Sequence, residues 1–198
     1  MDARAEKYDA CIFDFDGTLA DTTELNLGAL RAALAHHGIT PSAQWWDTVP
    51  VTSQQACRER LEHDYGIPVA ELVVAGRQYW LDNSTGLKAL PAVDVAIELA
   101  GQGMPLAVAS ANYADAVRAG LRAVAFDGLF HTVITAEDVR AVKPAPDAYL
   151  LAARRLRVDP SRCLAYDNTD EGVQAAQQAG MTVVDVRQGL TFQHPSTG

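Results

Sequence analysis

The sequence predicts an α/β protein whose core is a parallel β-sheet covered by helices on both faces, with a small helical domain inserted after the first strand. Short apolar runs, each of a length suited to a buried strand, alternate along the chain with segments that have helical periodicity. One long stretch, residues 22–88, interrupts this alternation because it contains helical patterns and no convincing strand. Alternation of strands and helices is typical of a parallel sheet. The chain must cross back from the end of one strand to the opposite edge of the sheet before the next parallel strand can begin, and a helix usually makes this crossover.

The interruption follows closely on the first apolar run, residues 10–13. The inserted helices are therefore expected to lie over the end of the first strand, where the chain leaves the sheet. Three helices are predicted in this stretch: one with Leu27, Leu30 and Leu34 along a single face, one over residues 52–65 and one over residues 69–81.

The alternation resumes after residue 88 and continues almost to the end of the chain. Gly103 and Gly180 stand just past two of the predicted helices, where a left-handed terminating residue is favoured. We therefore expect a Rossmann-like core domain of residues 1–20 and 88–198 and a helical cap domain of residues 21–87. The remaining predicted strands are 106–109, 132–135, 163–166 and 182–186, and the predicted helices are 93–100, 113–121, 146–156 and 171–179.

Composition and charge narrow the possible partners. The chain has 198 residues, of which 48% are hydrophobic, as a packed core requires. Its net charge of −9 argues against a nucleic acid partner, because binding phosphates along a strand needs a concentrated basic surface. No apolar stretch approaches the roughly 20 residues that cross a bilayer, and no signal-peptide pattern is present, so we expect no membrane partner. The three cysteines show no metal-ligand spacing and are expected to be reduced, which predicts a cytoplasmic location.

The pentapeptide that starts at Asp14, Asp-Phe-Asp-Gly-Thr, directly follows the first predicted strand. Because side chains alternate along a strand, Asp14 and Asp16 should project to the same side where the strand ends. Two carboxylates this close repel each other unless a cation lies between them, and oxygen ligands suit a hard divalent ion such as Mg²⁺. The motif therefore predicts a metal-assisted phosphoryl-transfer site.

Polar residues also follow the other predicted strands. In an open parallel sheet the ligand site forms at the carboxyl ends of the strands, so these residues should meet Asp14 and Asp16. They are Ser110 and Asn112 after the second strand, Lys143 in the loop after the third, and Asp167 and Asn168 after the fourth.

This set of groups suits transfer of a phosphoryl group to a carboxylate. Asp14 can attack phosphorus and form an aspartyl phosphate, while Asp16 can protonate the leaving alcohol and later activate water. Ser110, Asn112 and Lys143 are expected to bind the phosphoryl oxygens, and the metal would offset repulsion between Asp14 and the anionic phosphate.

These motifs resemble those of the haloacid dehalogenase-like hydrolases over nearly the whole chain. Asp14-Phe-Asp-Gly-Thr-Leu resembles the first motif of that family, Ser110 in Val-Ala-Ser-Ala-Asn the second, and Lys143 in Lys-Pro-Ala-Pro-Asp-Ala-Tyr the third. The resemblance is greatest to the branch of phosphoglycolate phosphatases, β-phosphoglucomutases and fructose-1-phosphate phosphatases, which carry a small helical cap after the first motif. It implies magnesium-dependent chemistry on a small phosphorylated metabolite.

The fourth motif departs from the pattern of this branch. Relatives usually have Glu-Asp-Ser there, with the Asp binding metal, whereas this chain has Asp167-Asn168-Thr169. The expected metal ligands are thus Asp14, Asp16, Asp167 and Asn168, with one negative charge missing at Asn168. A rival register pairs Asp167 with Glu171, but it requires a one-residue shift against the well-matched sequence that follows.

The cap also departs from its relatives at two places. Asn26 stands where the mutases have a His, and an amide cannot relay a proton as an imidazole can. In the relatives, one loop of the cap selects the substrate and often contains an arginine. The equivalent loop of this chain has Thr52 and Ser53. Asn26, Thr52 and Ser53 are therefore candidate substrate contacts.

The sequence best fits a magnesium-dependent phosphatase that hydrolyses a small phosphate monoester through an aspartyl phosphate. One alternative is a β-phosphoglucomutase-like phosphomutase, which would use the same core residues. The other is a catalytically weakened relative that binds phosphorylated ligands, for which Asn168 is the main support. The substrate is a sugar phosphate or related metabolite that the sequence does not specify further, and a monomer and a homodimer are equally compatible with it.

Overall fold

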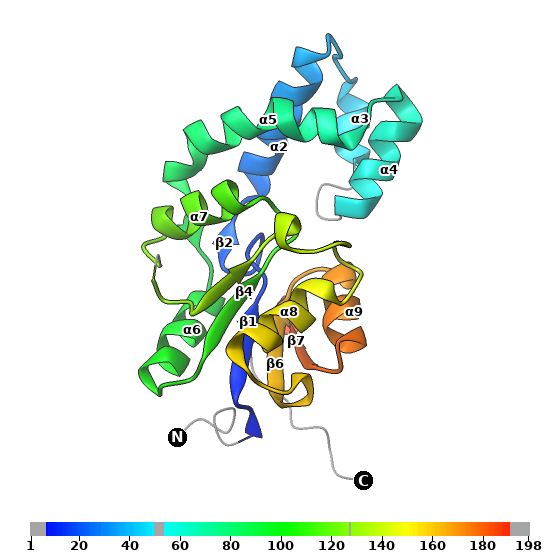
Figure 1. Cartoon of the computed structure of the whole chain (residues 1–198). Helices are drawn as coiled ribbons and strands as arrows, with labels where there is room; N and C mark the ends of the chain where they lie inside the picture. Colours follow the sequence, from blue (N-terminus) through cyan, green and yellow to red (C-terminus); the bar gives the residue numbers. More distant parts are fainter. Residues whose placement is uncertain (1–6, 50–53, 127, 191–198) are drawn as a thin grey trace.

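The computed structural model describes residues 7–49, 54–126 and 128–190, and its centre is a five-stranded parallel sheet (Figure 1). The strand order is β5-β4-β1-β6-β7, so the first strand lies in the middle. The predicted sheet is confirmed, with β5 and β7 each one residue shorter and β6 one residue longer than predicted. The strands are β1 (Ala10–Phe13), β4 (Leu106–Ala109), β5 (Thr132–Ile134), β6 (Cys163–Asp167) and β7 (Thr182–Asp185).

Helices cover both faces of the sheet because alternate strand residues point to opposite sides. Cys11 and Phe13 of β1 join one buried cluster with apolar residues of α6 and α7. Ala10 and Ile12 join a second cluster with residues of α8 and α9. These two clusters form the core on the two sides of the sheet, and the predicted Rossmann-like arrangement is confirmed. The helices are α6 (Ala92–Gly101), α7 (Ala114–Ala123), α8 (Asp147–Leu156) and α9 (Asp170–Gln178).

The described residues of the inserted stretch form four helices, which lie beyond one end of the sheet (Figure 1). They pack around a buried cluster of their own that includes Leu34, Trp45, Leu61 and Leu72. A short antiparallel ribbon of β2 (Ala20–Asp21) and β3 (Lys88–Ala89) pairs the two chain segments that lead into and out of the insertion. The helices are α2 (Thr23–His36), α3 (Ala43–Thr48), α4 (Gln54–Tyr65) and α5 (Val69–Asn83).

Helix α3 and the β2–β3 ribbon were not predicted, because both are too short to show a period. Helix α3 has six residues and begins where the Ser42 side chain accepts a hydrogen bond from the Trp45 backbone N–H. The ribbon joins two segments far apart in the sequence, each only two residues long.

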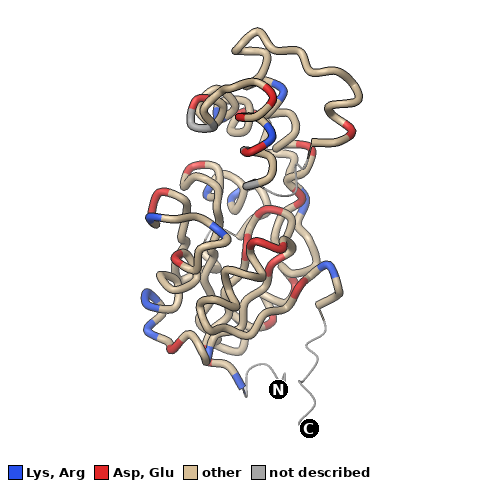
Figure 2. Tube along the Cα trace, turned by 90° about the vertical axis from the view of Figure 1, so that its right-hand side faces the viewer, with Lys and Arg blue, Asp and Glu red and all other residues tan. Residues whose placement is uncertain are grey.

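Figure 2 shows Lys and Arg positions singly or in short groups among Asp and Glu positions along the trace. The mixture of both signs agrees with the net charge of −9. Among the helices of the described ranges, none combines the length and apolar character required to span a bilayer.

Helices α2 and α5 approach each other closely at Gly76. A Cβ atom added at Gly76 would lie 2.7 Å from the backbone oxygen of Ala29, which cannot move independently of its helix. We expect Gly76→Ala to lower the free energy of unfolding by about 1–3 kcal/mol, because the two helices must separate. Urea unfolding followed by circular dichroism measures the change.

The matched control for this prediction is Gly101→Ala at the end of α6, where an added Cβ meets no atom within 4 Å. That substitution should leave stability unchanged or raise it by up to about 1 kcal/mol, since alanine restricts the unfolded chain. Equal stability of the Gly76→Ala and Gly101→Ala proteins would contradict the close packing of α2 and α5.

Candidate active site

The acids of the first motif lie where β1 ends, at the carboxyl edge of the sheet. Asp14 is 6% exposed, and its backbone N–H donates to the Tyr166 oxygen of the neighbouring strand β6 at 2.9 Å. Gly17 follows with φ of +79°, a left-handed conformation that glycine adopts without strain, and it turns the chain back toward Ala20. This turn leaves Asp16 partly exposed at the rim of the site.

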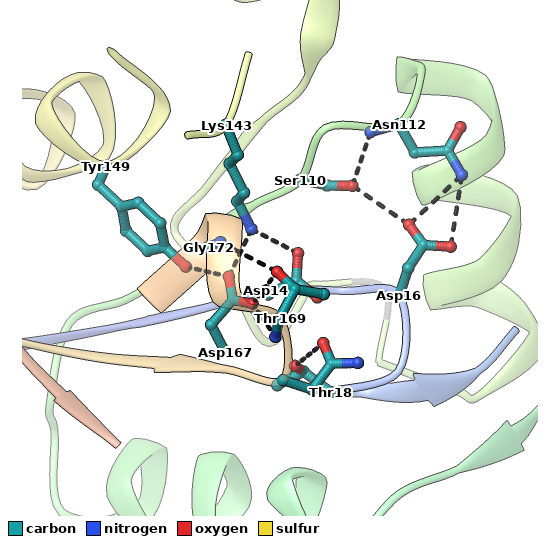
Figure 3. A network of polar contacts seen from close by, with 11 residues as sticks. Asp14, Asp16, Thr18, Ser110, Asn112, Lys143, Tyr149, Asp167, Thr169 and Gly172 are labelled. Atoms are coloured by element: carbon teal, nitrogen blue, oxygen red, sulfur yellow. Dashed lines mark hydrogen bonds and ion pairs between the residues drawn. The ribbon is translucent and has the colours of Figure 1, made fainter. Parts of the chain in front are cut away.

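The other predicted residues meet these acids as expected (Figure 3). Ser110 follows β4 and is 1% exposed, and Asp167 is the fully buried last residue of β6. Lys143 reaches the same place from the loop between β5 and α8 and is only 9% exposed. Three strands and one loop thus bring charged and polar side chains to a single edge of the sheet.

Lys143 lies between two buried carboxylates. Its Nζ donates to Asp14 Oδ1 at 2.6 Å and to Asp167 Oδ2 at 2.7 Å. Tyr149 on α8 also donates to Asp167 Oδ2, at 2.6 Å. The second oxygen, Asp167 Oδ1, accepts from the backbone N–H and the hydroxyl of Thr169 at 2.9 and 2.8 Å. Protein groups therefore occupy both oxygens of Asp167.

Burial and the neighbouring charges change the acidity of these groups. Burial raises the pKa of Asp14 to about 7; the Lys143 ammonium opposes this rise, and the charges of Asp167 and Asp16 add to it. Burial alone would also raise the pKa of Asp167, but the charge and hydrogen bond of Lys143, with those of Tyr149 and Thr169, hold it below its usual value. Although burial disfavours a charged lysine, the same two carboxylates raise the pKa of Lys143 above its usual value, so it stays protonated.

The two oxygens of Asp14 have different environments. Oδ1 accepts the hydrogen bond from Lys143, whereas Oδ2 is buried and has no hydrogen-bond partner. A buried carboxylate oxygen without a partner is costly, and such atoms in native proteins usually have a functional reason. Oδ2 of Asp14 is therefore the atom available for bond formation or for binding a cation.

Asp16 is held by donors from two parts of the chain. Ser110 Oγ and Asn112 Nδ2, in the loop after β4, each donate to Asp16 at 3.4 Å (Figure 3). Asn26 on α2 donates from Nδ2 to Asp16 Oδ1 at 3.3 Å. The structure therefore brings Asn26, predicted as a substrate contact, next to Asp16. The other two predicted contacts, Thr52 and Ser53, lie outside the described residues.

Asn168 lies beside the turn of the first motif. Its Oδ1 accepts a hydrogen bond from Thr18 Oγ1 at 3.0 Å, and a Cβ atom at Gly17 would overlap its Nδ2. Across the described parts of the chain, no group of three or more His, Cys, Asp or Glu side chains has a geometry suited to a metal ion. Glu171, from the rival register, lies in the first turn of α9, which the Thr169 side chain caps.

Tyr149 and Thr169 are site residues that the sequence reasoning missed. Tyr149 appears in the quoted third motif, and its spacing of six residues from Lys143 places it in the first turn of α8. The start of α8 lies at the carboxyl edge of the sheet. The position of Tyr149 in the first turn was therefore the sequence feature that indicated a contact with Asp167. Thr169 follows Asp167 by two residues, a separation at which a side chain can accept from the backbone in a turn.

A cavity of about 200 Å³ lies between the inserted helices and the start of α7 in the core. Asn26 and Asn112, which both donate to Asp16, lie in its wall, so the cavity adjoins the acid. Among the described residues, its wall is otherwise mainly apolar. Wall residues beyond the asparagines include Leu30, Leu72, Arg77 and Trp80.

The fold and the site together define a class of α/β protein in which paired acids after the central strand meet a lysine and a third acid at the carboxyl edge of a parallel sheet. The family described as "Haloacid dehalogenase-like hydrolase" matches residues 11–186. The chain therefore belongs to the haloacid dehalogenase-like hydrolases, as the resemblance of the motifs predicted.

Named relatives match most of the chain. Fructose-1-phosphate phosphatase YqaB of Escherichia coli is 34% identical over 188 residues, covering 92% of this chain and 98% of that protein. Validoxylamine A 7'-phosphate phosphatase of Streptomyces hygroscopicus subsp. limoneus is 29% identical and covers 93% of this chain and 87% of its own length. The solved structure of CbbY from Rhodobacter sphaeroides in complex with phosphate has a TM-score of 0.77 at 27% identity, covering 89% of this chain and 84% of that one.

Proposed function

We propose that this protein is a phosphatase that hydrolyses a small phosphate monoester, a sugar phosphate or a related metabolite, by way of a phosphorylated Asp14. The observation that carries the proposal is the buried Asp14 carboxylate, with one oxygen held by Lys143 and the other without a partner. Two relatives that match nearly the whole chain are named as phosphatases of a sugar phosphate and of another small phosphate ester, which supports the same reaction class.

The first half of the reaction moves the phosphoryl group to the protein. The carboxylate of Asp14 attacks phosphorus, so that a bond from Asp14 to phosphorus forms while the bond from phosphorus to the ester oxygen breaks. Asp16, in its protonated form, transfers its proton to that oxygen, and a neutral alcohol leaves. Lys143 lies beside Asp14, and its positive charge offsets the negative charge on the phosphoryl oxygens.

The second half returns both acids to their starting state. Asp16, now a carboxylate, takes a proton from a water molecule whose oxygen attacks phosphorus, and the bond to Asp14 breaks. Inorganic phosphate leaves, with Asp16 again protonated. We propose that Ser110 and Asn112, which donate to Asp16 in the structure, bind the phosphoryl oxygens.

Hydrolysis fits the surroundings of Asp16 better than isomerisation of a sugar phosphate does. A phosphomutase must return the phosphoryl group to a sugar hydroxyl instead of water. Asn26, the described residue of the inserted helices that donates to Asp16, is an amide and cannot exchange protons with a substrate hydroxyl.

We propose that residues 21–87 act as a cap over a core of residues 1–20 and 88–198.

Two acids and the Asn168 amide together offer oxygen donors that suit a divalent metal ion, for which Mg²⁺ is the natural choice. The unpartnered Oδ2 of Asp14, the carboxylate of Asp16 and the amide oxygen of Asn168 are hard oxygen donors of the kind that Mg²⁺ binds. Asp167 would enter this set only by giving up one of its hydrogen bonds. Bound there, the ion would reduce repulsion between the carboxylates and the anionic substrate.

An aspartate at position 168 should strengthen metal binding, because it adds a negative charge while keeping an oxygen for the Thr18 hydroxyl. We expect Asn168→Asp to lower the magnesium concentration for half-maximal phosphate release by about tenfold. Magnesium titrations of activity and of thermal stability give two independent readouts. As a control, Asn83→Asp adds the same charge at the end of α5, and it should leave both titrations unchanged.

Phosphate release from a panel of small phosphate esters, with and without magnesium, tests the reaction class. We expect metal-dependent release of inorganic phosphate from at least one ester, with no isomerised sugar phosphate among the products. An isomerised product without free phosphate would point to the mutase reaction. Binding of the esters without either product would point to a weakened relative that only binds its ligand.

A further inference from the structure

Trp80 on α5 is connected to Asp16 through a single residue. The residue is 4% exposed, and its Nε1 donates to Asn26 Oδ1 on α2 at 2.8 Å. Asn26 in turn donates from Nδ2 to Asp16 Oδ1 at 3.3 Å and to Thr22 Oγ1 at 3.2 Å. A chain of hydrogen bonds therefore runs from the last inserted helix, through the first, to the acid proposed to protonate the leaving group.

The polarity of these groups makes Trp80 the residue that orients Asn26. An indole N–H can only donate, so it pairs with the amide oxygen and leaves the amide NH₂ facing Asp16. With the amide turned over, its oxygen would face the Asp16 carboxylate, and its NH₂ would face the indole N–H. The Thr22 hydroxyl can both donate and accept, so it does not select either orientation.

The second amide that holds Asp16 is oriented in the same way. Asn112 Oδ1 accepts from the backbone N–H of Tyr113 at 2.8 Å, which leaves its Nδ2 to donate to Asp16 at 3.4 Å. In both asparagines a donor-only N–H fixes the oxygen, so that both NH₂ groups point at the same carboxylate. The N–H that fixes Asn112 belongs to the backbone of Tyr113 in the core. The N–H that fixes Asn26 belongs to the side chain of Trp80 on the inserted helices.

We propose that Trp80 is a positioning residue for the phosphatase reaction, which fixes the Asn26 amide and through it the carboxylate of Asp16. This inference rests on the proposed function, because the role of Asp16 comes from it. Trp80 also lines the cavity next to Asp16, but the positioning role depends on its N–H rather than on its ring. Loss of the N–H should therefore lower the turnover rate while leaving substrate affinity nearly unchanged.

Trp80→Phe removes the N–H and keeps an aromatic ring in the same place. We expect kcat to fall about fivefold to tenfold, the effect of one lost buried hydrogen bond, with KM changed less than about twofold. In an Asn26→Ala background, which already lacks the amide, Trp80→Phe should have no further effect on kcat. This non-additivity distinguishes positioning through Asn26 from a general loss of packing.

Trp45→Phe is the matched control, because Trp45 is another buried tryptophan, 7% exposed, whose Nε1 donates to a side chain at 2.7 Å. Its acceptor is Asp64 on α4, which takes no part in the proposed chemistry. The control should retain full kcat even where its stability falls. A kcat of Trp80→Phe within twofold of an active wild-type protein, or equal losses with and without the Asn26 amide, would overturn the inference.

A readout that needs no activity keeps this test separate from that of the proposed function. In ¹⁵N-labelled protein, the Trp80 indole N–H signal, assigned by its loss in Trp80→Phe, should be slow to exchange and should shift in Asn26→Ala, while the Trp45 signal stays in place. An unshifted Trp80 signal would contradict the hydrogen bond between Trp80 and Asn26 and would overturn the inference. A wild-type protein that releases no phosphate from any ester would instead overturn the proposed function, and the catalytic role of Trp80 would fall with it.

Discussion

Asp14→Asn is expected to reduce phosphate release by about 10³-fold or more, because the amide cannot act as the nucleophile that accepts the phosphoryl group. The substitution keeps the shape of the side chain and an oxygen for the Lys143 hydrogen bond. The loss should therefore reflect chemistry rather than unfolding. Steady-state phosphate release measures the effect, with Asp94→Asn, an exposed acid in the first turn of α6, as the control.

The stability of the Asp14→Asn protein gives a second, independent check. Because burial raises the pKa of Asp14 to about 7 in the folded protein, the folded state holds its proton more tightly than the unfolded chain does. The wild-type protein should therefore lose stability, relative to the variant, as the pH rises from about 4 to 7 in the absence of metal. An active Asp14→Asn protein would exclude Asp14 as the nucleophile, and a variant that unfolds at neutral pH would contradict the environment assigned to it.

Lys143→Met is expected to remove activity and to destabilise the fold together. Without the ammonium, Asp14 and Asp167 remain buried and lose the charge that both of them contact. Breaking a buried ion pair by removing one partner typically lowers the free energy of unfolding by about 3–5 kcal/mol. Loss of a positive charge at the phosphoryl oxygens should also lower kcat by at least about 10²-fold.

A second substitution separates these two effects of Lys143→Met. Adding Asp167→Asn to Lys143→Met removes one of the stranded carboxylates, so it should restore part of the stability without restoring activity. Lys88→Met, at an exposed lysine of β3, controls for the loss of positive charge alone and should match the wild-type protein in both assays. Full stability of the Lys143→Met protein at pH 7 would contradict the buried ion pairs on which the proposed site is built.

The sequence predicted the parallel sheet because each strand is a short apolar run. The burial of such a strand can be recognised from its own residues, without knowing which strands lie beside it. It also predicted that Ser110, Lys143 and Asp167 would meet Asp14, since polar residues at the carboxyl ends of parallel strands share one edge. It predicted Asn26 as a candidate contact only through the resemblance to the mutases. These predictions needed only the strand ends and not the pairing of individual side chains.

Pairings of side chains could not be predicted because they depend on burial and on contacts between distant segments. The hydrogen bond from Lys143 to Asp14 joins residues 129 positions apart, and that from Trp80 to Asn26 joins residues 54 apart. The four hydrogen bonds that Asp167, a predicted metal ligand, accepts from Lys143, Tyr149 and Thr169 were not predicted. Helix α3 and the β2–β3 ribbon were missed because neither has the length to show a period.

Asp14 is expected to become phosphorylated during each turnover. The most direct measurement is to mix the protein with an ester that it hydrolyses, stop the reaction in acid within the first turnover, and map the phosphoryl group by mass spectrometry. We expect a phosphoryl group on the peptide that contains Asp14, absent from the Asp14→Asn protein. Phosphate release at full rate with no phosphorylated peptide, or with the phosphoryl group on another residue, would contradict the proposed role of Asp14.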